Sequence, residues 1–379
     1  MNLNFKNKTF DLFHPLIIVV LVILFLIIAM PMWYIYKQIE APNLDLYIYV
    51  SIGLLFFISG IFTSNYLMKR DNSVCFKNKN IKNPHKLSIF EKYSKNELII
   101  VGLVILGIVL QTINLIMLGG IPLFSATLKA KATTKIWLIS YIIFLPSINI
   151  LLAKYNRKTH YILLIIGIFL FALTGYRTTP IAIMLSSLIT LYYTRDIDFK
   201  YILLLILAIA VVLVVVGFIA VQAISWQHWT LNPLELVSHR AAFTLNILNT
   251  SIQHQYDTMG SLFYSTLTGY FTHTDPRVLI GSVTVGREHS ITATIFGPAL
   301  LDFGIVGMIV QMFLLGLILK TLHKLQNYEK RIHTAFYGIL LAQTIIWIET
   351  GPNDIVVWLF YLIGIFIIIK SLRGLNNEG

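Results

Sequence analysis

Several basic side chains in this sequence stand beside turns or ionisable neighbours, where they could bind an anion. Arg177 follows Gly175-Tyr176 in a short polar link between two apolar segments. A guanidinium in such a place needs water, a carboxylate or a phosphate, and its planar fork can donate two hydrogen bonds to a phosphate at once. Pro180 is expected to open the next helix, whose N-terminus also attracts anions. The alternative is a structural Arg177 paired with a carboxylate.

A second group of ionisable residues, Arg287, Glu288 and His289, stands shortly before another apolar segment. One helical face could not hold all three side chains, but a turn could bring them together. Imidazole is a natural general base near neutral pH. The competing interpretation is a polar loop at the membrane interface without a catalytic role.

Other ionisable residues could contact a ligand or only stabilise the fold. His239 and Arg240 are adjacent and allow the same two interpretations as the second group. Arg277 follows Asp275-Pro276, a pattern typical of a turn with a local ion pair. Asp302 is interpreted first as a capping or pairing group, and it is kept with Arg277 and Tyr176 as a candidate substrate contact.

Two carboxylates and a run of aromatic residues complete the candidate groups. Glu349 and Asp354 flank Gly351-Pro352-Asn353, and they could neutralise the arginines or bind a hydroxylated ligand. Aromatic side chains offer flat faces that suit sugar rings, and they equally suit a membrane interface. These aromatic residues are Tyr256, Phe263, Tyr264, Tyr270 and Phe271.

The elements that must position these side chains are membrane-spanning helices. Hydrophobic residues form 57% of the chain and charged residues 12%, which excludes an ordinary soluble domain. At roughly 20 apolar residues per span, 379 residues leave room for about ten spans in one integral membrane domain, 1–379. The spans are predicted at 14–36, 46–68, 97–118, 136–153, 161–174, 180–194, 201–224, 300–319, 334–349 and 355–370.

The distribution of charge orients the predicted bundle. Most of the 29 Lys and Arg residues fall on one side of the spans, and the positive-inside rule makes that side cytoplasmic. Both termini are then cytoplasmic, as are the basic loop 69–96 and its single Cys75. The same rule explains most of the net charge of +12 without nucleic acid. The basic residues left on the outer side are Lys37, Lys129, Lys131, Lys135, Arg177, Arg240, Arg277 and Arg287.

The segment 225–290 is predicted to form one large extracytoplasmic loop. It opens with Trp226 and Trp229, which suit an interface. Asn232 is a candidate N-cap before Pro233, with Glu235 in the first turn. Apolar residues then recur at helical spacing, so an amphipathic helix should lie on the outer leaflet or cap the bundle. Its expected stripe is Leu234, Val237, Ala241, Leu245, Leu248 and Ile252.

The sequence lacks the motifs of several classes of functional site. It contains no phosphate-binding P-loop, no H-E-x-x-H motif and no Cys/His cluster with zinc spacing, so neither a metal nor a cofactor is predicted. The spans carry no regular gating charges of a voltage sensor, and signs of the inverted repeats of transporters are weak.

Three stretches resemble the O-antigen polymerases. They are Gly119-Gly120-Ile121-Pro122-Leu123, the Gly175-Tyr176-Arg177 turn, and His289 to Gly307. In the last stretch, His289-Ser290 followed by Leu301-Asp302-Phe303-Gly304-Ile305-Val306-Gly307 is similar to a pattern shared with the O-antigen ligases. Asp302 stands where many relatives carry Glu or another polar residue.

The resemblance implies a metal-independent, inverting glycosyltransferase of GT-C-like architecture in the cell (inner or plasma) membrane. Donor and acceptor would be polyprenyl-diphosphate-linked oligosaccharides, and a flippase and a chain-length regulator are candidate partner proteins. By this resemblance Arg177, Arg240 and Arg287 would hold the diphosphate, and His289 would activate the acceptor hydroxyl.

Two other functions compete with a polymerase. A ligase would move a finished glycan to a different acceptor, and the sequence barely separates it from a polymerase. A transporter or flippase of lipid-linked sugars would need a polar path through the bundle, and the predicted spans carry few charges to line one.

Overall fold

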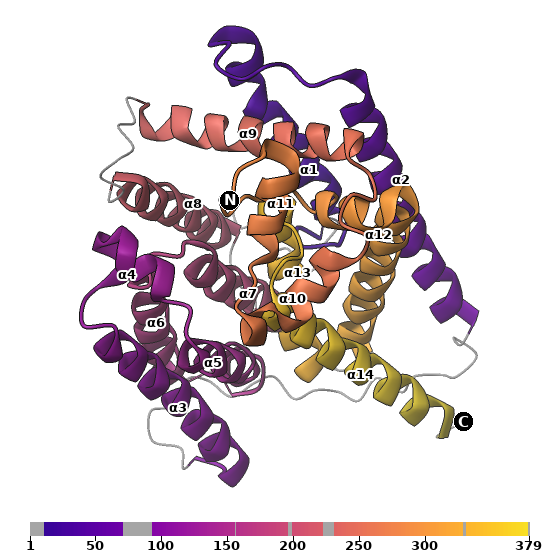
Figure 1. The fold of residues 1–379 in the computed structure, drawn as a ribbon. Coiled ribbons are helices and arrows are strands. Elements are labelled where there is room, and N and C mark those ends of the chain that lie inside the picture. Colours follow the sequence, from indigo (N-terminus) through magenta and orange to yellow (C-terminus); the bar gives the residue numbers. More distant parts are fainter. Residues whose placement is uncertain are drawn as a thin grey trace.

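The computed structural model describes residues 11–70, 93–155, 157–195, 199–222, 231–328 and 331–377, and every regular element in these ranges is a helix (Figure 1). The helices of the first half are α1 (Ile17–Met30), continued by the π-helical turn η1 (Pro31–Ile35), α2 (Leu44–Arg70), α3 (Lys95–Met117), the 3-10 turn η2 (Pro122–Phe124), α4 (Ala126–Lys131), α5 (Lys135–Lys154), α6 (Lys158–Ala172) and α7 (Thr178–Thr194). Those of the second half are α8 (Phe199–Gln222), α9 (Pro233–Gln253), α10 (Ser261–Thr272), α11 (Pro276–Val285), α12 (Gly297–Tyr328), α13 (Ile332–Thr350) and α14 (Ile355–Asn377).

Each of the predicted spans falls on one of these helices, which confirms an all-helical bundle. Seven helices in the described ranges are long and apolar enough to cross a membrane: α1 with η1, α2, α3, α5, α12, α13 and α14. The three other predicted spans coincide with α6, α7 and α8. The total of about ten spans therefore stays a prediction.

Helix α13 forms the centre of the bundle, because it packs against α7, α5, α12, α14 and α1. It approaches α7 so closely that a Cβ at Gly338 would lie 2.6 Å from the Thr190 hydroxyl. A second close approach joins α2 to α12. There, a Cβ at Gly60 would meet the Phe313 carbonyl oxygen at 2.2 Å, and one at Gly316 would meet the Phe57 carbonyl oxygen at 2.1 Å. Small residues at such crossings allow helices to pack without a hydrophobic driving force between them.

Helix α9 confirms the amphipathic helix predicted after Asn232. The Asn232 side chain accepts hydrogen bonds from the Leu234 and Glu235 amides, and the Glu235 carboxylate accepts one from the Asn232 amide. The helix runs across one end of the bundle, where it packs on α1, α12 and α8 (Figure 1). The predicted stripe is buried from Ala241 to Ile252. Leu234, the first residue of the predicted stripe, is 77% exposed at the helix start.

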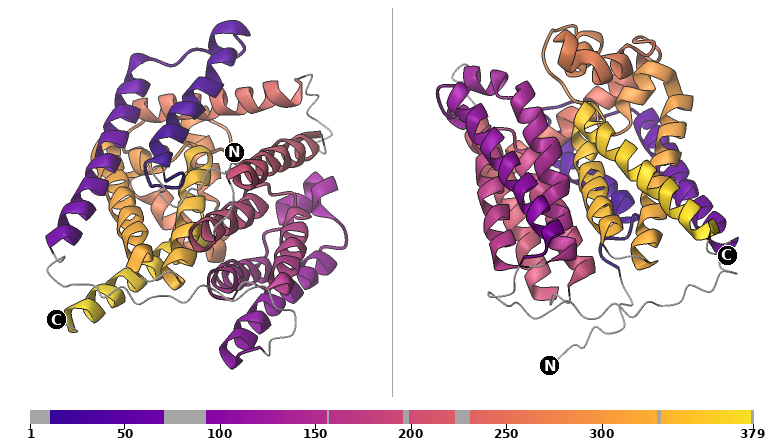
Figure 2. Two further views of the ribbon diagram at one scale, coloured as in Figure 1. Left: turned by 180° about the vertical axis from the view of Figure 1, so that it is seen from behind. Right: turned by 90° about the horizontal axis from the view of Figure 1, so that it is seen from below.

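Helices α10 and α11 lie at one end of the bundle, and α14 runs toward the other end (Figure 2, right). At that other end, a cluster of polar side chains binds the segment before α1. The Asp11 carboxylate accepts a hydrogen bond from the Tyr193 hydroxyl at 2.7 Å and pairs with His323 Nε2 at 2.7 Å. His14 Nε2 lies 2.6 Å from Lys320 Nζ. These contacts fix the start of α1 against α7 and α12. The basic loop with Cys75, and Trp226 with Trp229, lie wholly or mostly outside the described residues.

The predicted orientation can be tested with two thiols at opposite ends. Ser282 is exposed on α11, and Ser282→Cys in a Cys75→Ser background should react with a membrane-impermeant maleimide added to intact cells. The unaltered protein, whose single thiol is Cys75, should react only after the membrane is opened. The opposite labelling pattern would contradict the orientation.

Candidate functional site

Two of the predicted arginines meet on one carboxylate. Glu349, near the end of α13, accepts a hydrogen bond from Arg240 Nε at 2.9 Å and is also paired with the Arg177 guanidinium. Arg177 precedes α7 and Arg240 lies on α9, so the cluster joins three helices from distant parts of the sequence. Of the two roles left open for Glu349, this geometry corresponds to neutralising the arginines.

The chain reaches this position through a tight turn. Gly175 has a φ of +74°, a left-handed conformation that glycine adopts without strain, and a Cβ there would lie 3.2 Å from the Leu123 Cα. Helix α7 begins at Thr178, so Pro180 lies within its first turn rather than at its first residue. Arg177 therefore stands directly before a helix N-terminus, as the sequence indicated, where peptide dipoles favour a negative ligand.

Lys129 is a third cation of this cluster, and we did not single it out from the sequence. Burial lowers the pKa of Lys129, and the charges of Arg177 and Arg240 lower it further. Its ammonium lies 5.9 Å from the ring centre of Tyr176, and the Tyr176 hydroxyl donates to the Lys129 carbonyl at 3.0 Å. Three cations against one carboxylate leave a formal charge of +2. We call Arg177, Arg240, Lys129 and Glu349 the basic cluster.

His239 accompanies this cluster on α9. Burial lowers the pKa of His239, and the neighbouring Arg240 charge lowers it further. The imidazole is therefore neutral near pH 7, because its pKa lies below the ordinary value of 6.5. His239 adds a hydrogen-bonding group rather than a fourth charge.

An apolar groove of about 210 Å³ ends at the basic cluster. Arg177 and Glu349 line the groove, and its other walls are side chains from α1, α7 and α13. Those apolar lining residues are Leu21, Leu24, Phe25, Ile28, Ile181, Ile345, Ile346 and Ile348. The groove therefore offers a hydrocarbon surface next to a concentration of positive charge.

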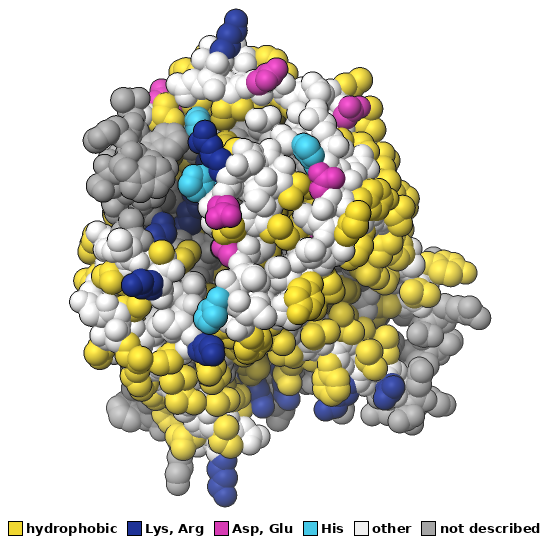
Figure 3. All heavy atoms as spheres, viewed as in Figure 1, with side chains coloured by type: hydrophobic (Ala, Val, Ile, Leu, Met, Phe, Trp, Pro, Cys, Tyr) yellow, Lys and Arg dark blue, Asp and Glu magenta, His cyan; other side chains and the backbone are white. Residues whose placement is uncertain are grey.

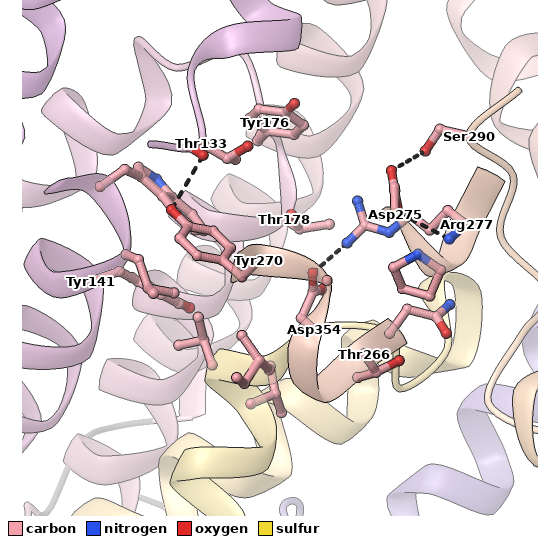
Figure 4. A pocket seen from close by; sticks show the side chains of 18 of the residues that line it. Thr133, Tyr141, Tyr176, Thr178, Thr266, Tyr270, Asp275, Arg277, Ser290 and Asp354 are labelled. Carbon is pink, nitrogen blue, oxygen red and sulfur yellow. Dashed lines mark hydrogen bonds and ion pairs between the residues drawn. The ribbon is translucent and has the colours of Figure 1, made fainter. Parts of the chain in front are cut away.

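A larger cavity of about 600 Å³ adjoins the groove, and Thr178 and Ile346 line both. Figure 4 shows Tyr141 and Tyr270 on one side of this cavity, and Arg277, Asp275 and Asp354 on the other. Tyr176, a predicted substrate contact, also lines it. The face drawn in Figure 3 shows Lys, Arg and His side chains along a hollow between α4 and the α10–α11 pair.

Arg277 forms an ion pair with a distant carboxylate rather than the local one expected at its turn. Its guanidinium pairs with Asp354, the residue before α14 (Figure 4). Asp275 caps α11 by accepting a hydrogen bond from the Arg277 amide at 2.9 Å, and it also accepts one from the Ser290 hydroxyl at 3.3 Å. Asp354 thus resembles Glu349 in that each carboxylate neutralises arginine.

The remaining predicted site residues lie elsewhere. Arg287, Glu288 and His289 are exposed in the segment after α11 and do not line the cavity or the groove, whereas the next residue, Ser290, lines the cavity. Asp302 is buried, and its carboxylate accepts hydrogen bonds from the Thr258 hydroxyl and from the Leu262 and Phe263 amides. These contacts cap α10, which agrees with the capping interpretation of Asp302.

Two features of the site have no counterpart in the sequence patterns. His273, at the end of α10, lines the cavity in a left-handed conformation with a φ of +59°. Trp137 and Tyr141 stack on α5 with ring centres 5.6 Å apart, and both line the cavity. Within the described ranges, no three His, Cys, Asp or Glu side chains form a group that could hold a metal ion.

Comparison with known proteins decides the family. The O-antigen polymerase family model matches residues 11–361. The chain belongs to the O-antigen polymerase family. Membership, together with the apolar helices, makes it a multi-pass membrane protein of polysaccharide biosynthesis.

Two similar proteins come from Methanocaldococcus jannaschii, and both are described as uncharacterized. The first is 29% identical over 76% of this chain and 70% of its own length. The second is 29% identical over 71% of this chain and 75% of its own length. No solved structure matches the chain.

The lowered pKa of Lys129 predicts how anion binding by this O-antigen polymerase homologue depends on pH. Only the protonated amine attracts a diphosphate, so affinity for farnesyl diphosphate should fall as pH rises through the Lys129 pKa, below the ordinary value of 10.5. Lys129→Gln should bind about tenfold more weakly at neutral pH and lose this alkaline decline. Calorimetric titration from pH 7 to 10 measures both effects.

Lys131→Gln is the matched control, because Lys131 is exposed at the end of the same helix. It should retain both the affinity and the decline. Identical pH profiles for Lys129→Gln and the unaltered protein would remove Lys129 from the basic cluster.

Proposed function

We propose that this protein is a glycan repeat-unit polymerase. It joins polyprenyl-diphosphate-linked oligosaccharides on the extracytoplasmic face of the cell (inner or plasma) membrane by inverting, metal-independent glycosyl transfer. The single observation that carries the proposal is the basic cluster beside an apolar groove, in which Arg177 and Arg240 share the Glu349 carboxylate and Lys129 adds a third positive charge. We also propose that residues 1–379 form one membrane domain of GT-C-like architecture with cytoplasmic termini.

The charge of the cluster suits the leaving group of this reaction. Breaking the bond between a sugar and a lipid diphosphate develops negative charge on the departing phosphate oxygen. Cations already fixed in a low-dielectric site stabilise that charge more strongly than water does. Arg177 and Arg240 are held by Glu349 before any substrate binds, so little reorganisation is needed when charge develops.

The groove suits the lipid attached to that diphosphate. A polyprenyl chain is a hydrocarbon, and the walls from α1, α7 and α13 are lined by Leu, Ile and Phe side chains. Burying its methylene groups would stabilise the complex by roughly 0.8 kcal/mol for each group that leaves water. A lipid in the groove would bring its diphosphate to Arg177, because Arg177 lines the groove together with these apolar side chains.

The chemical step is a displacement at the anomeric carbon. An acceptor hydroxyl attacks from the face opposite the diphosphate and forms the new glycosidic bond. The electron pair of the broken bond stays on the departing phosphate oxygen. A general base takes the proton of the attacking hydroxyl. We propose His289 for this role, since the adjacent Ser290 lines the cavity, and His273 on the cavity wall is the alternative.

Arg177→Ala should stop chains at one repeat unit while the protein remains in the membrane. Loss of one fixed donor to the developing charge typically lowers the rate by about 10²–10³, and Arg240 would still hold Glu349. Gel separation of the lipid-linked glycans measures chain length, and immunoblotting measures the amount of protein. Arg331→Ala is the control, because Arg331 is exposed just before α13. Normal-length polymer in Arg177→Ala would contradict the assignment.

The identity of the base can be tested by one pair of variants. His289→Gln should lower the rate of polymer formation by about 10²–10⁴, because the attacking hydroxyl loses its proton acceptor, whereas His273→Gln should retain activity. The reverse result would assign the base to His273, and full activity in both variants would exclude an imidazole base.

The products that accumulate without this protein separate a polymerase from a ligase. A deletion strain should accumulate single lipid-linked repeats, whereas full-length chains stranded on lipid would indicate a ligase. Transfer by the purified protein, with all substrate supplied from the outer side, would exclude a purely transporting role.

A further inference from the structure

We infer that the cavity of about 600 Å³ binds the sugar residue joined to the diphosphate and that it selects an uncharged sugar over a sugar acid. This inference rests on the proposed function, because it assumes that the diphosphate occupies the basic cluster. It adds the chemical class of the sugar and the side chains that recognise it.

The cavity lies where the first sugar must lie. Thr178 lines both the cavity and the apolar groove, and Arg177 precedes it in the chain. A diphosphate at Arg177 therefore lies in the groove that holds the lipid, one residue away from the wall that the groove shares with the cavity. Since the diphosphate joins lipid to sugar, the sugar can extend from there into the adjoining cavity.

The walls of the cavity combine flat aromatic faces with hydrogen-bonding groups. Trp137 and Tyr141 stack with their rings inclined by only 18°, and Tyr270 lies near Tyr141 in Figure 4. Aromatic faces can pack against the C–H faces of a sugar ring while the polar groups orient it. The volume of about 600 Å³ is within the usual range for small-molecule sites.

Some polar atoms of the lining residues lack partners. In the described part of the chain, Trp137 Nε1, Trp347 Nε1 and Asn353 Oδ1 are buried without a hydrogen-bond partner. Buried polar groups are normally paired, so these two donors and one acceptor require explanation. A sugar hydroxyl can both donate and accept a hydrogen bond. It would therefore pair with either kind of atom once rotation of the protein side chain turns that atom toward the cavity.

The distribution of charge selects against a sugar acid. Asp275 and Asp354 line the cavity on either side of Arg277, whose guanidinium is already paired with Asp354. Lys135 also lines it, so two carboxylates face two cations and the formal charge is zero. The basic cluster, at +2, lies next to the cavity. A sugar carboxylate in the cavity would approach two aspartates, whereas the phosphates would reach unneutralised positive charge.

Three synthetic ligands test this inference: farnesyl diphosphate, the same compound with a terminal glucosyl residue, and the same compound with a glucuronosyl residue. The two sugars differ only in a hydroxymethyl group or a carboxylate. Binding to the purified protein should be about tenfold tighter with glucose than without sugar. Glucuronate should bind roughly fivefold more weakly than glucose.

Variants assign these differences to the cavity. Trp137→Ala should remove the gain from glucose and leave farnesyl diphosphate binding unchanged, whereas Trp137→Phe should keep most of the gain. Ile139→Ala, an exposed position on the same helix, is the matched control and should keep all of it. Asp275→Asn can still cap α11, because Asn is as good an N-cap as Asp. Asp275→Asn should reduce the ratio between the affinities for the glucosyl and the glucuronosyl ligand.

The outcomes separate this inference from the proposed function. Three results would overturn the inference while leaving the basic cluster in place. They are equal affinity for the glucosyl and glucuronosyl ligands, no gain in affinity from glucose, or an unchanged gain in Trp137→Ala. No binding of farnesyl diphosphate at all would instead overturn the proposed function together with the inference.

Discussion

The Glu349 carboxylate is the interaction on which this site depends. It brings together Arg177 from the turn before α7 and Arg240 from α9, two guanidiniums that would otherwise repel each other and Lys129. One carboxylate can pair with both guanidiniums, but its single negative charge does not neutralise three positive ones. Because the cluster holds three positive charges and one negative charge, its excess charge suits an anionic ligand. The central position of α13 fixes the helix that carries this carboxylate.

The helices around this carboxylate separate three chemical environments. Hydrocarbon walls from α1, α7 and α13 lie beside the basic cluster, and a charge-balanced aromatic cavity adjoins this groove at Thr178 and Ile346. The polar cluster around Asp11 and His323 fixes the start of α1, and α1 forms one wall of the groove. The parts of the proposed ligand, a lipid joined through a diphosphate to a sugar, correspond to these three environments.

Sequence patterns predicted the helices well because each depends on local composition. Long apolar runs located the helices, and Asn232, Pro233 and Glu235 marked the start of α9 because capping is a contact between near neighbours. The turn that carries Arg177 was also predicted from the sequence, since Gly175 and Pro180 are strong local signals of a turn and a helix start. Leu234 shares the helical spacing of the stripe, but its side chain is exposed at the start of α9 because spacing alone does not show where packing begins.

The parts of the site that the sequence did not reveal depend on contacts between distant segments. The pairing of Glu349 with Arg177 and Arg240 joins residues more than a hundred positions apart, so spacing cannot predict it. Lys129 looked like one more outer lysine, because only its burial beside two arginines distinguishes it. Trp137 was likewise not distinguished by the sequence, because its place on the cavity wall depends on contacts between distant helices. In contrast, Arg287, Glu288 and His289 are consecutive in sequence, but all three are exposed and line neither the cavity nor the groove.

The most direct measurement is an experimental structure of the protein in lipid nanodiscs with farnesyl diphosphate bound. The account predicts that the diphosphate oxygens lie about 3 Å from the guanidinium nitrogens of Arg177 and Arg240, with the farnesyl chain in the groove between α1 and α13. A ligand bound elsewhere, with Glu349 still pairing with both arginines and no phosphate beside them, would contradict it.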